Sequence, residues 1–219
     1  MSDPYNPLAE EHLARQVADA VERQPLLPVP PPERFPGAGL YAFYYVGDNP
    51  LYTALRDSAA PIYVGKAALG ASRIGIGAST TERKLYGRIA KHSRSINAGA
   101  GLALDDFRCR ALVTNDVWIV LGESGLISTY RPLWNVVIDG FGNNDPGSGR
   151  YAGRVSAWDT LHPGRAWVEK LEEPNERTRG ELEQLVAEHL ADPDATPLVS
   201  PVEVDPGPDT DEDDDLKDA

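Results

Sequence analysis

Two short segments rich in aromatic and β-branched residues, separated by a turn, most constrain how this chain can fold. The first spans residues 40–46 and stops at the Gly-Asp-Asn-Pro sequence of residues 47–50, and the second spans residues 61–65. Such segments are typical of strands, because their side chains pack well on a pleated surface. The turn allows the two segments to pair in antiparallel fashion. We therefore expect the chain to be built around a small sheet that contains this pair.

Further elements follow from the spacing of apolar residues. Residues 107–113 alternate in polarity and predict a third strand. Helices are expected over 8–23, from the threonines at 80–81 to about 97–99, over 116–130 and over 175–190. Residues 134–137, which follow Pro132, are expected to form a short strand or extended piece. The sequence thus predicts an α/β (α+β) domain with a mainly antiparallel three-stranded sheet flanked by helices.

Proline density and composition divide the chain into four parts. Six prolines lie between residues 24 and 36 and disfavour both helix and sheet ladder, so residues 1–36 are expected to form a helix and an extended arm. Residues 37–140 are expected to hold the core. Residues 141–191 contain glycine- and arginine-rich loops followed by the last helix. Residues 192–219 are rich in proline and acids and are expected to form a disordered tail.

The net charge of −13 is concentrated at one end of the chain. Residues 168–219 contain 18 acids and 4 bases, which leaves 17 bases and 16 acids for residues 1–167. Within residues 61–110, nine bases stand against three acids. Because the local charge of a surface, and not the net charge of the chain, decides which partners bind there, nucleic acid is not excluded as a partner.

Targeting signals are not expected in this sequence. It contains no run of eighteen apolar residues and no signal-peptide pattern. We therefore expect a cytoplasmic protein without a membrane partner.

Six residues whose side chains could take part in catalysis or metal binding follow one another through the predicted core: Tyr41, Tyr63, Arg88, His92, Glu123 and Asn135. Arg88 and His92 are four residues apart on a predicted helix, so both leave the same face. One carboxylate suits Mg²⁺, which keeps water and phosphate oxygens as further ligands. A guanidinium can contact a phosphate oxygen, and a phenol or an imidazole can accept a proton from water. Any one of these residues would usually be structural, but the ordered set indicates phosphodiester hydrolysis.

The motifs that carry these residues resemble those of the GIY-YIG nuclease superfamily, and within it the type II restriction endonuclease branch. Gly39-Leu40-Tyr41 and Tyr63-Val64-Gly65 correspond to the two triplets, Leu85–His92 to the arginine helix with its histidine, and Glu123–Ile127 with Asn135 to the glutamate helix and closing asparagine. The resemblance covers about residues 37–140. The sequence departs from the family in two ways. Leucine and valine replace the isoleucines of the triplets, and 21 residues separate the triplets, a wider gap than is usual.

The resemblance implies a role for each residue of the set. Glu123 would bind Mg²⁺, for which Mn²⁺ could substitute, and Arg88 would contact the phosphate. Tyr41 would be the general base, with His92 orienting or replacing it, and Asn135 would maintain the geometry of the site. Tyr44 and Tyr45 remain competitors of Tyr41 as the partner of Tyr63. The residues expected to contact DNA are Lys66, Arg73, Lys91, Arg150 and Arg154, and Arg165 belongs to the same arginine-bearing loops.

The expected function is that of a type II restriction endonuclease, a site-specific deoxyribonuclease that cuts duplex DNA at a GC-rich palindrome. A palindromic site requires two active sites related by a dyad, which predicts a homodimer. No small-molecule cofactor is expected. Two alternatives stay open: a GIY-YIG nuclease of repair or mobile-element type, and a non-catalytic DNA-binding module of the same fold.

Overall fold

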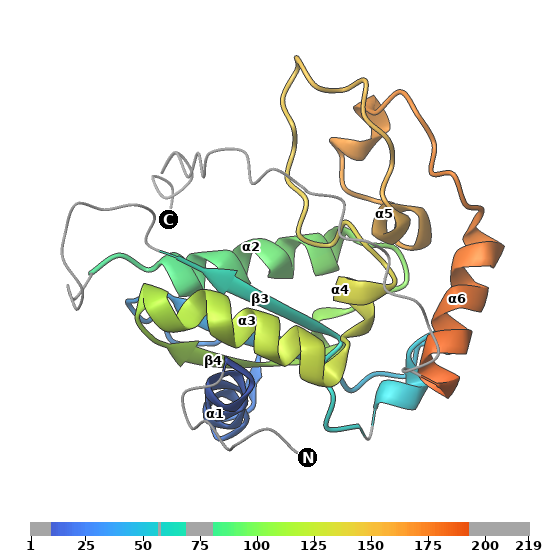
Figure 1. Cartoon of the computed structure of the whole chain (residues 1–219). Helices are drawn as coiled ribbons and strands as arrows, with labels where there is room; N and C mark the ends of the chain where they lie inside the picture. The colour runs from blue at the N-terminus through green and yellow to red at the C-terminus, as the bar shows by residue number, and fades with distance from the viewer. Residues whose placement is uncertain (1–9, 57, 69–80, 193–219) are drawn as a thin grey trace.

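The structure, a computed structural model, describes residues 10–56, 58–68 and 81–192 (Figure 1). Its sheet contains four strands in the order β1-β4-β2-β3, and every neighbouring pair is antiparallel. The strands are β1 (Leu27–Pro28), β2 (Gly39–Tyr45), β3 (Tyr63–Ala67) and β4 (Phe107–Val113). The predicted mixed α/β architecture with an antiparallel sheet is confirmed, but the sheet has four strands and not three.

The additional strand lies in the proline-rich arm, where we had expected no sheet pairing. Leu27 and Pro28 pair with Cys109 and Arg108 of β4. Proline lacks an N–H donor, which excludes it from central strands but not from the outer edge of a sheet. Because β1 is two residues long and lies at the edge, Pro28 causes no loss in the ladder, and the prediction for this segment was wrong.

Helices cover both faces of the sheet. On one face, α1 (Glu10–Glu22) and α3 (Asp116–Tyr130) enclose an apolar cluster that includes Val21, Leu40, Val64 and Leu126. The other face carries α2 (Lys84–Ala98), α4 (Leu133–Val136), α5 (Ala157–Leu161) and α6 (Arg179–Ala191). Three 3₁₀ turns, Thr53–Leu55, Leu104–Asp106 and Val168–Lys170, complete the elements.

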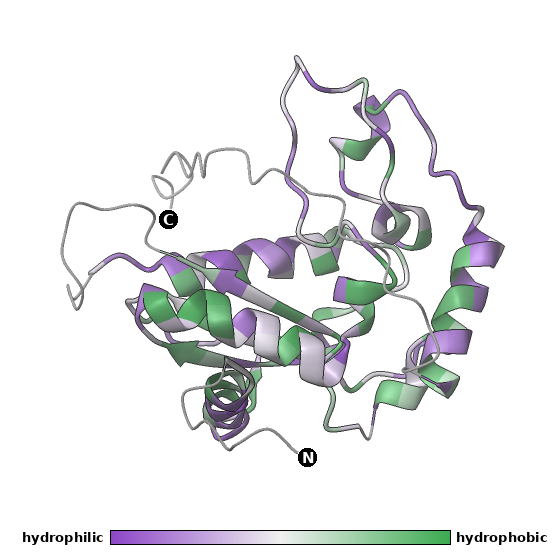
Figure 2. Cartoon of the chain, in the orientation of Figure 1, coloured by the Kyte–Doolittle hydropathy of each residue, from purple (hydrophilic) through white to green (hydrophobic). Residues whose placement is uncertain are grey.

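The second face holds the larger core. Its buried cluster joins Tyr41 and Phe43 of β2 to Trp134, Trp158 and Leu182 from the C-terminal half of the chain. Residues on both sides of position 140 therefore share one core. In Figure 2, α2 is largely hydrophilic along its visible side, whereas the first half of α3 is hydrophobic. Among the described residues, no helix is long and apolar enough to cross a membrane.

Two helix boundaries differ from the prediction. α2 begins at Lys84 and not at the threonines, because the backbone of Gly37 forms hydrogen bonds on both sides of this start. The Gly37 N–H donates to Glu82 O at 2.7 Å, and the Gly37 carbonyl accepts from Leu85 N at 2.9 Å. α6 begins at Arg179, where Thr178 and Glu181 form a reciprocal capping box.

Residues 133–136 form the short helix α4, although we had predicted a strand or extended piece. This helix lies beside the edge of β3, and the N–H of Trp134 donates to Ile62 O at 2.9 Å. The expected disorder of residues 193–219 falls outside the described residues.

Candidate active site

The glycines of the two triplets make room for Tyr41. In the β2–β3 pairing, Tyr41 lies opposite Gly65, and its ring covers that glycine. A Cβ atom at position 65 would come within 2.4 Å of the Tyr41 hydroxyl oxygen. A Cβ atom at Gly39 would come within 2.0 Å of the Leu112 carbonyl oxygen on β4. Both positions therefore need glycine, because any side chain would displace either the phenol or the strand that carries it.

Tyr41 is the tyrosine of β2 that lies beside Tyr63, with ring centroids 6.1 Å apart. Successive side chains of a strand point to opposite faces, which places Tyr44 in the cluster under α1 and α3. Tyr45 shares the face of Tyr41 but contacts Tyr52 and Phe107, with centroid distances of 5.5 and 5.3 Å. The pleat therefore excludes Tyr44, and the position of Tyr45 further along β2, beside Tyr52 and Phe107, excludes Tyr45.

Helix α2 adds Arg88 and His92 to the same face. The imidazole of His92 is 2% exposed, and its ring centroid lies 5.6 Å from that of Tyr41 and 5.4 Å from that of Tyr63. The charge of Arg88 affects the pKa values of Tyr41, Tyr63 and His92, which shows that its guanidinium lies near all three. The structure therefore brings four of the six predicted residues together.

Burial controls the protonation of these groups. Burial raises the pKa of Tyr41 well above its usual value, Tyr63 raises it further, and Arg88 opposes the shift. Burial also raises the pKa of Tyr63. For His92, burial is again the largest cause and lowers the pKa well below its usual value, aided by Arg88, Lys91 and Arg165. At neutral pH the two phenols keep their protons, and the imidazole is neutral.

Two buried polar atoms point to a ligand or water at this site. Within the described part of the chain, the Nε2 atom of His92 has no hydrogen-bond partner, and the hydroxyl oxygen of Tyr41 has no well-aligned one, although Tyr63 and Arg88 lie beside it. A buried polar atom without a partner costs about 1–3 kcal/mol, so it is usually satisfied by something else. A phosphate oxygen or the attacking water would satisfy both atoms.

Glu123 approaches the site from α3, on the other side of the edge strand. Figure 1 shows β3 running between α2 and α3. A Glu123 carboxylate oxygen lies 2.9 Å from Lys66 Nζ, and the charge of Glu123 raises the pKa of Tyr63. Among the described residues, no group of three histidine, cysteine or acidic side chains could enclose a metal ion. A single carboxylate fits a hard cation that completes its shell with water and phosphate oxygens, as Mg²⁺ does.

Asn135 holds the second triplet in place. Its amide nitrogen donates to Val64 O at 2.9 Å, and its amide oxygen accepts from Val64 N at 2.8 Å. Because β3 is an edge strand, these two backbone groups have no strand partner on that side. The Asn135 side chain therefore supplies the hydrogen bonds that a further strand would make to Val64.

The family comparison agrees with this geometry. A family model described as the Eco29kI GIY-YIG domain matches residues 33–190, which include all six residues of the set. The chain belongs to the Eco29kI GIY-YIG family. A comparison with curated proteins found no match. The predicted membership of the GIY-YIG superfamily, in its restriction endonuclease branch, is confirmed, and the chain carries a GIY-YIG nuclease domain that acts on DNA.

The sequence analysis missed two residues that close this GIY-YIG site. Phe141 stacks on His92 with a centroid distance of 4.6 Å and meets Tyr63 edge-on at 4.8 Å. A Cβ atom at Gly142 would lie 3.2 Å from the Tyr63 hydroxyl and 4.0 Å from an Arg88 Nη atom. The available signal was an aromatic residue between two glycines at positions 140–142, within a stretch that otherwise looks like a surface loop.

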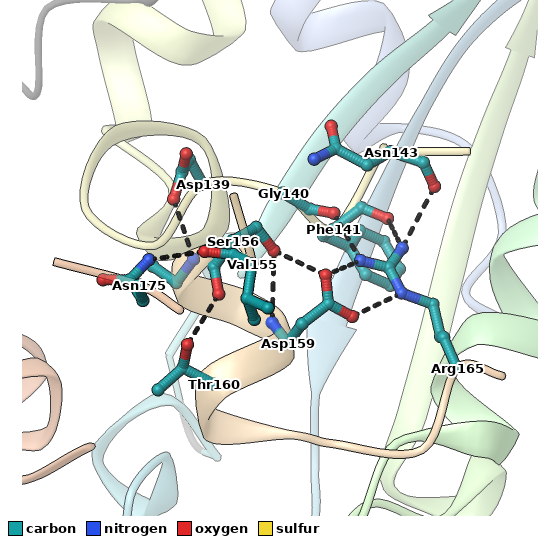
Figure 3. A network of polar contacts seen from close by, with 11 residues as sticks. Asp139, Gly140, Phe141, Asn143, Val155, Ser156, Asp159, Thr160, Arg165 and Asn175 are labelled. Carbon is teal, nitrogen blue, oxygen red and sulfur yellow. Dashed lines mark hydrogen bonds and ion pairs between the residues drawn. The ribbon is translucent and has the colours of Figure 1, made fainter. Parts of the chain in front are cut away.

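A buried ion pair holds this loop against the GIY-YIG core (Figure 3). Arg165 is 5% exposed and donates from Nε to Asp159 at 2.6 Å. It also donates to the carbonyls of Gly140, Phe141 and Asn143 at 2.9, 3.2 and 3.0 Å. Arg165 therefore differs from the exposed arginines of the same loops, because its guanidinium is bound inside the protein and holds the loop in place.

The five residues predicted to contact DNA have different surroundings. Lys66 pairs with Glu123, and Lys91 lies on α2 beside His92. Arg150 is exposed in the loop before α5. Arg154 pairs with Glu173 at 2.9 Å and with Glu176. Arg73 lies outside the described residues.

Proposed function

We propose that this protein is a type II restriction endonuclease that hydrolyses duplex DNA at a specific GC-rich palindrome with Mg²⁺. The observation that carries the proposal is the convergence of Tyr41, Tyr63, Arg88 and His92 on one buried face, with Glu123 beside the adjacent strand edge. This arrangement combines a phosphate-binding cation, proton acceptors and one metal-binding carboxylate.

Glu123 would hold the Mg²⁺, and Mn²⁺ is expected to substitute for it. Bound there, the cation would supply positive charge to the phosphate as negative charge develops during hydrolysis. Lys66, which pairs with Glu123 in the free chain, would turn its ammonium towards a phosphate oxygen when the carboxylate accepts the metal.

Arg88 would donate to the non-bridging oxygens of the scissile phosphate, where its fork of donors suits the geometry. In its phenolate form, Tyr41 would take the proton of the attacking water as the bond between that water and phosphorus forms. The bond from phosphorus to the leaving sugar oxygen then breaks, and that oxygen takes up a proton from solvent water. His92 is the competing base, because its neutral imidazole can accept a proton without first losing one.

The assembly expected for this function is a homodimer. A palindromic duplex presents two scissile phosphates related by a twofold axis, and each chain contributes one GIY-YIG site. Two copies of the chain would therefore cut both strands of one site.

The test is cleavage of plasmid DNA by the purified chain and by its Glu123→Gln variant in Mg²⁺. The wild-type protein should yield discrete fragments. Glu123→Gln should reduce the rate by at least two orders of magnitude, because a neutral amide binds metal poorly, while DNA binding persists. The matched control is Glu183→Gln, which removes a carboxylate from an exposed ion pair on α6 with a similar separation of 2.8 Å.

Normal cleavage by Glu123→Gln would refute the metal assignment. A wild-type protein that binds DNA but cuts none, in either Mg²⁺ or Mn²⁺, would favour the non-catalytic module. Cleavage at unrelated positions, without discrete fragments, would contradict the restriction assignment.

A further inference from the structure

A cavity of about 420 Å³ lies between α2 and the segment that runs from residue 143 to residue 170. Basic and amide side chains dominate its lining, which includes Lys91, Arg94, Asn143, Asn144, Arg165 and Lys170. The mechanism proposed above uses none of these side chains for chemistry.

Both walls of the cavity continue directly from walls of the active site. On α2, Lys91 precedes the buried His92 and Arg94 follows two residues later. On the other wall, Asn143 follows Gly142, whose Cα faces the Tyr63 hydroxyl and Arg88. A DNA strand with one phosphate bound at Arg88 would therefore reach this cavity along the protein surface.

Cations outnumber acids in the lining of the cavity, and one wall is held by buried contacts. Four cations line it against one carboxylate, Asp145, which lies 3.8 Å from Lys170 and accepts from Tyr151 at 3.0 Å. Arg165 is bound to Asp159 and is held between the rings of Trp158 and Trp167, with centroid distances of 4.8 and 4.9 Å. Its charge is thus largely compensated, and it supports the wall.

Lys91 and Arg94 place two cations on the α2 wall of the cavity. They are three residues apart on α2, so their side chains leave neighbouring positions of one helix face. Asn143 and Asn144 place neutral hydrogen-bonding amides on the opposite wall. Cations on one wall and uncharged donors on the other suit an oxyanion that stays partly hydrated, such as a backbone phosphate.

We propose that this cavity binds a backbone phosphate of the DNA strand that is cut, displaced along the strand from the scissile phosphate. Arg88 and Arg94 are separated by about 9 Å along the helix axis. Successive phosphates of one strand are offset by about 3.4 Å along a duplex. A duplex whose axis runs along α2 would therefore place the second or third phosphate from the cut at the level of this cavity. The inference rests on the proposed function, because it assumes that Arg88 marks the scissile phosphate.

The test is the salt dependence of DNA binding by the full-length protein, measured without metal on a short duplex between about 50 and 200 mM salt. Each phosphate contact contributes about 0.9 to the slope of log affinity against log salt. The double variant Lys91→Gln with Arg94→Gln should lower the magnitude of the slope by about 0.9, the contribution of one phosphate. The pair Lys91→Arg with Arg94→Lys keeps both charges and should keep the wild-type slope.

The matched control is Arg23→Gln, an exposed cation just after α1 on the opposite face of the sheet, which should leave the slope unchanged. An unchanged slope in the double variant, or an equal loss in Arg23→Gln, would overturn the proposal. The two proposals fail separately. A wild-type protein that cuts DNA while the double variant keeps its slope rejects the cavity alone, whereas a reduced slope in a protein that never cuts rejects only the nuclease assignment.

Discussion

At the residue scale, Tyr41 and His92 share one buried environment, but burial changes their chemistry in opposite directions. Loss of water disfavours the charged form of each group, so the pKa of the phenol rises and that of the imidazole falls. The phenol therefore holds its proton more tightly than usual, whereas the imidazole is ready to accept one. Arg88 lowers both pKa values, because its charge favours a phenolate and disfavours an imidazolium.

The pH dependence of single-turnover cleavage distinguishes the two candidate bases. If Tyr41 is the base, the rate should keep rising between about pH 6.5 and 9.5, because the phenol ionises only above this range. If His92 is the base, the rate should be flat over the same range, because the imidazole is already neutral. On our assignment, Tyr41→Phe should lower the rate about 10²- to 10⁴-fold and keep the fold. A fast Tyr41→Phe enzyme with a flat profile would transfer the role to His92.

At the element scale, α4 and β3 illustrate how a short helix can complete a sheet. β3 is an edge strand, and its outer backbone groups would otherwise need water or another strand. The Asn135 side chain bonds both groups of Val64, and the N–H of Trp134 bonds Ile62. The result is a fixed β3 edge that separates the ring of Tyr63 from Glu123.

We expect Asn135→Ala to destabilise the protein by about 1–2 kcal/mol, because two partly buried backbone groups lose their partners. Thermal unfolding should show this as a fall of several degrees in Tm, with a loss of cleavage that exceeds the unfolded fraction. Asn115→Ala is the matched control, since the Asn115 side chain makes no capping hydrogen bond to α3. Equal Tm values for the two variants would show that Asn135 does not hold β3.

At the scale of the whole molecule, charge is distributed very unevenly. The full chain carries −13, and residues 193–219 contribute ten acids and one base, a balance of −9. Without that segment the chain would carry −4. The basic residues of α2 that face the proposed DNA path therefore belong to a protein whose net charge is negative.

Removal of residues 193–219 is expected to tighten non-specific DNA binding several-fold at low salt, because it removes acids that repel phosphate. The gain should shrink as salt screens the charges, with a Debye length of about 10 Å at 0.1 M. Full-length protein with the ten acids changed to amides is the control for chain length, and it should behave like the truncated form. Equal affinities of wild-type and truncated protein at low salt would contradict this expectation.

The local pattern of the sequence was sufficient for most of the main elements. The density of aromatic and β-branched residues placed β2, the alternation of polarity placed β4, and the spacing of Arg88 and His92 placed both on one face of α2. These features depend on residues that are close in the chain, where backbone geometry alone relates sequence to structure.

Tertiary structure decided what depends on residues far apart in the chain. The pairing of Pro28 with Arg108, the choice of Tyr41 over Tyr45, and the closure of the site by Phe141 each join distant segments. The burial of Arg165 belongs to the same class, because its partners span residues 140 to 159. The spacing of residues within one helix or strand does not predict such contacts. They arise only when the sheet and its helices pack, and burial then determines which polar groups are neutral and which are charged.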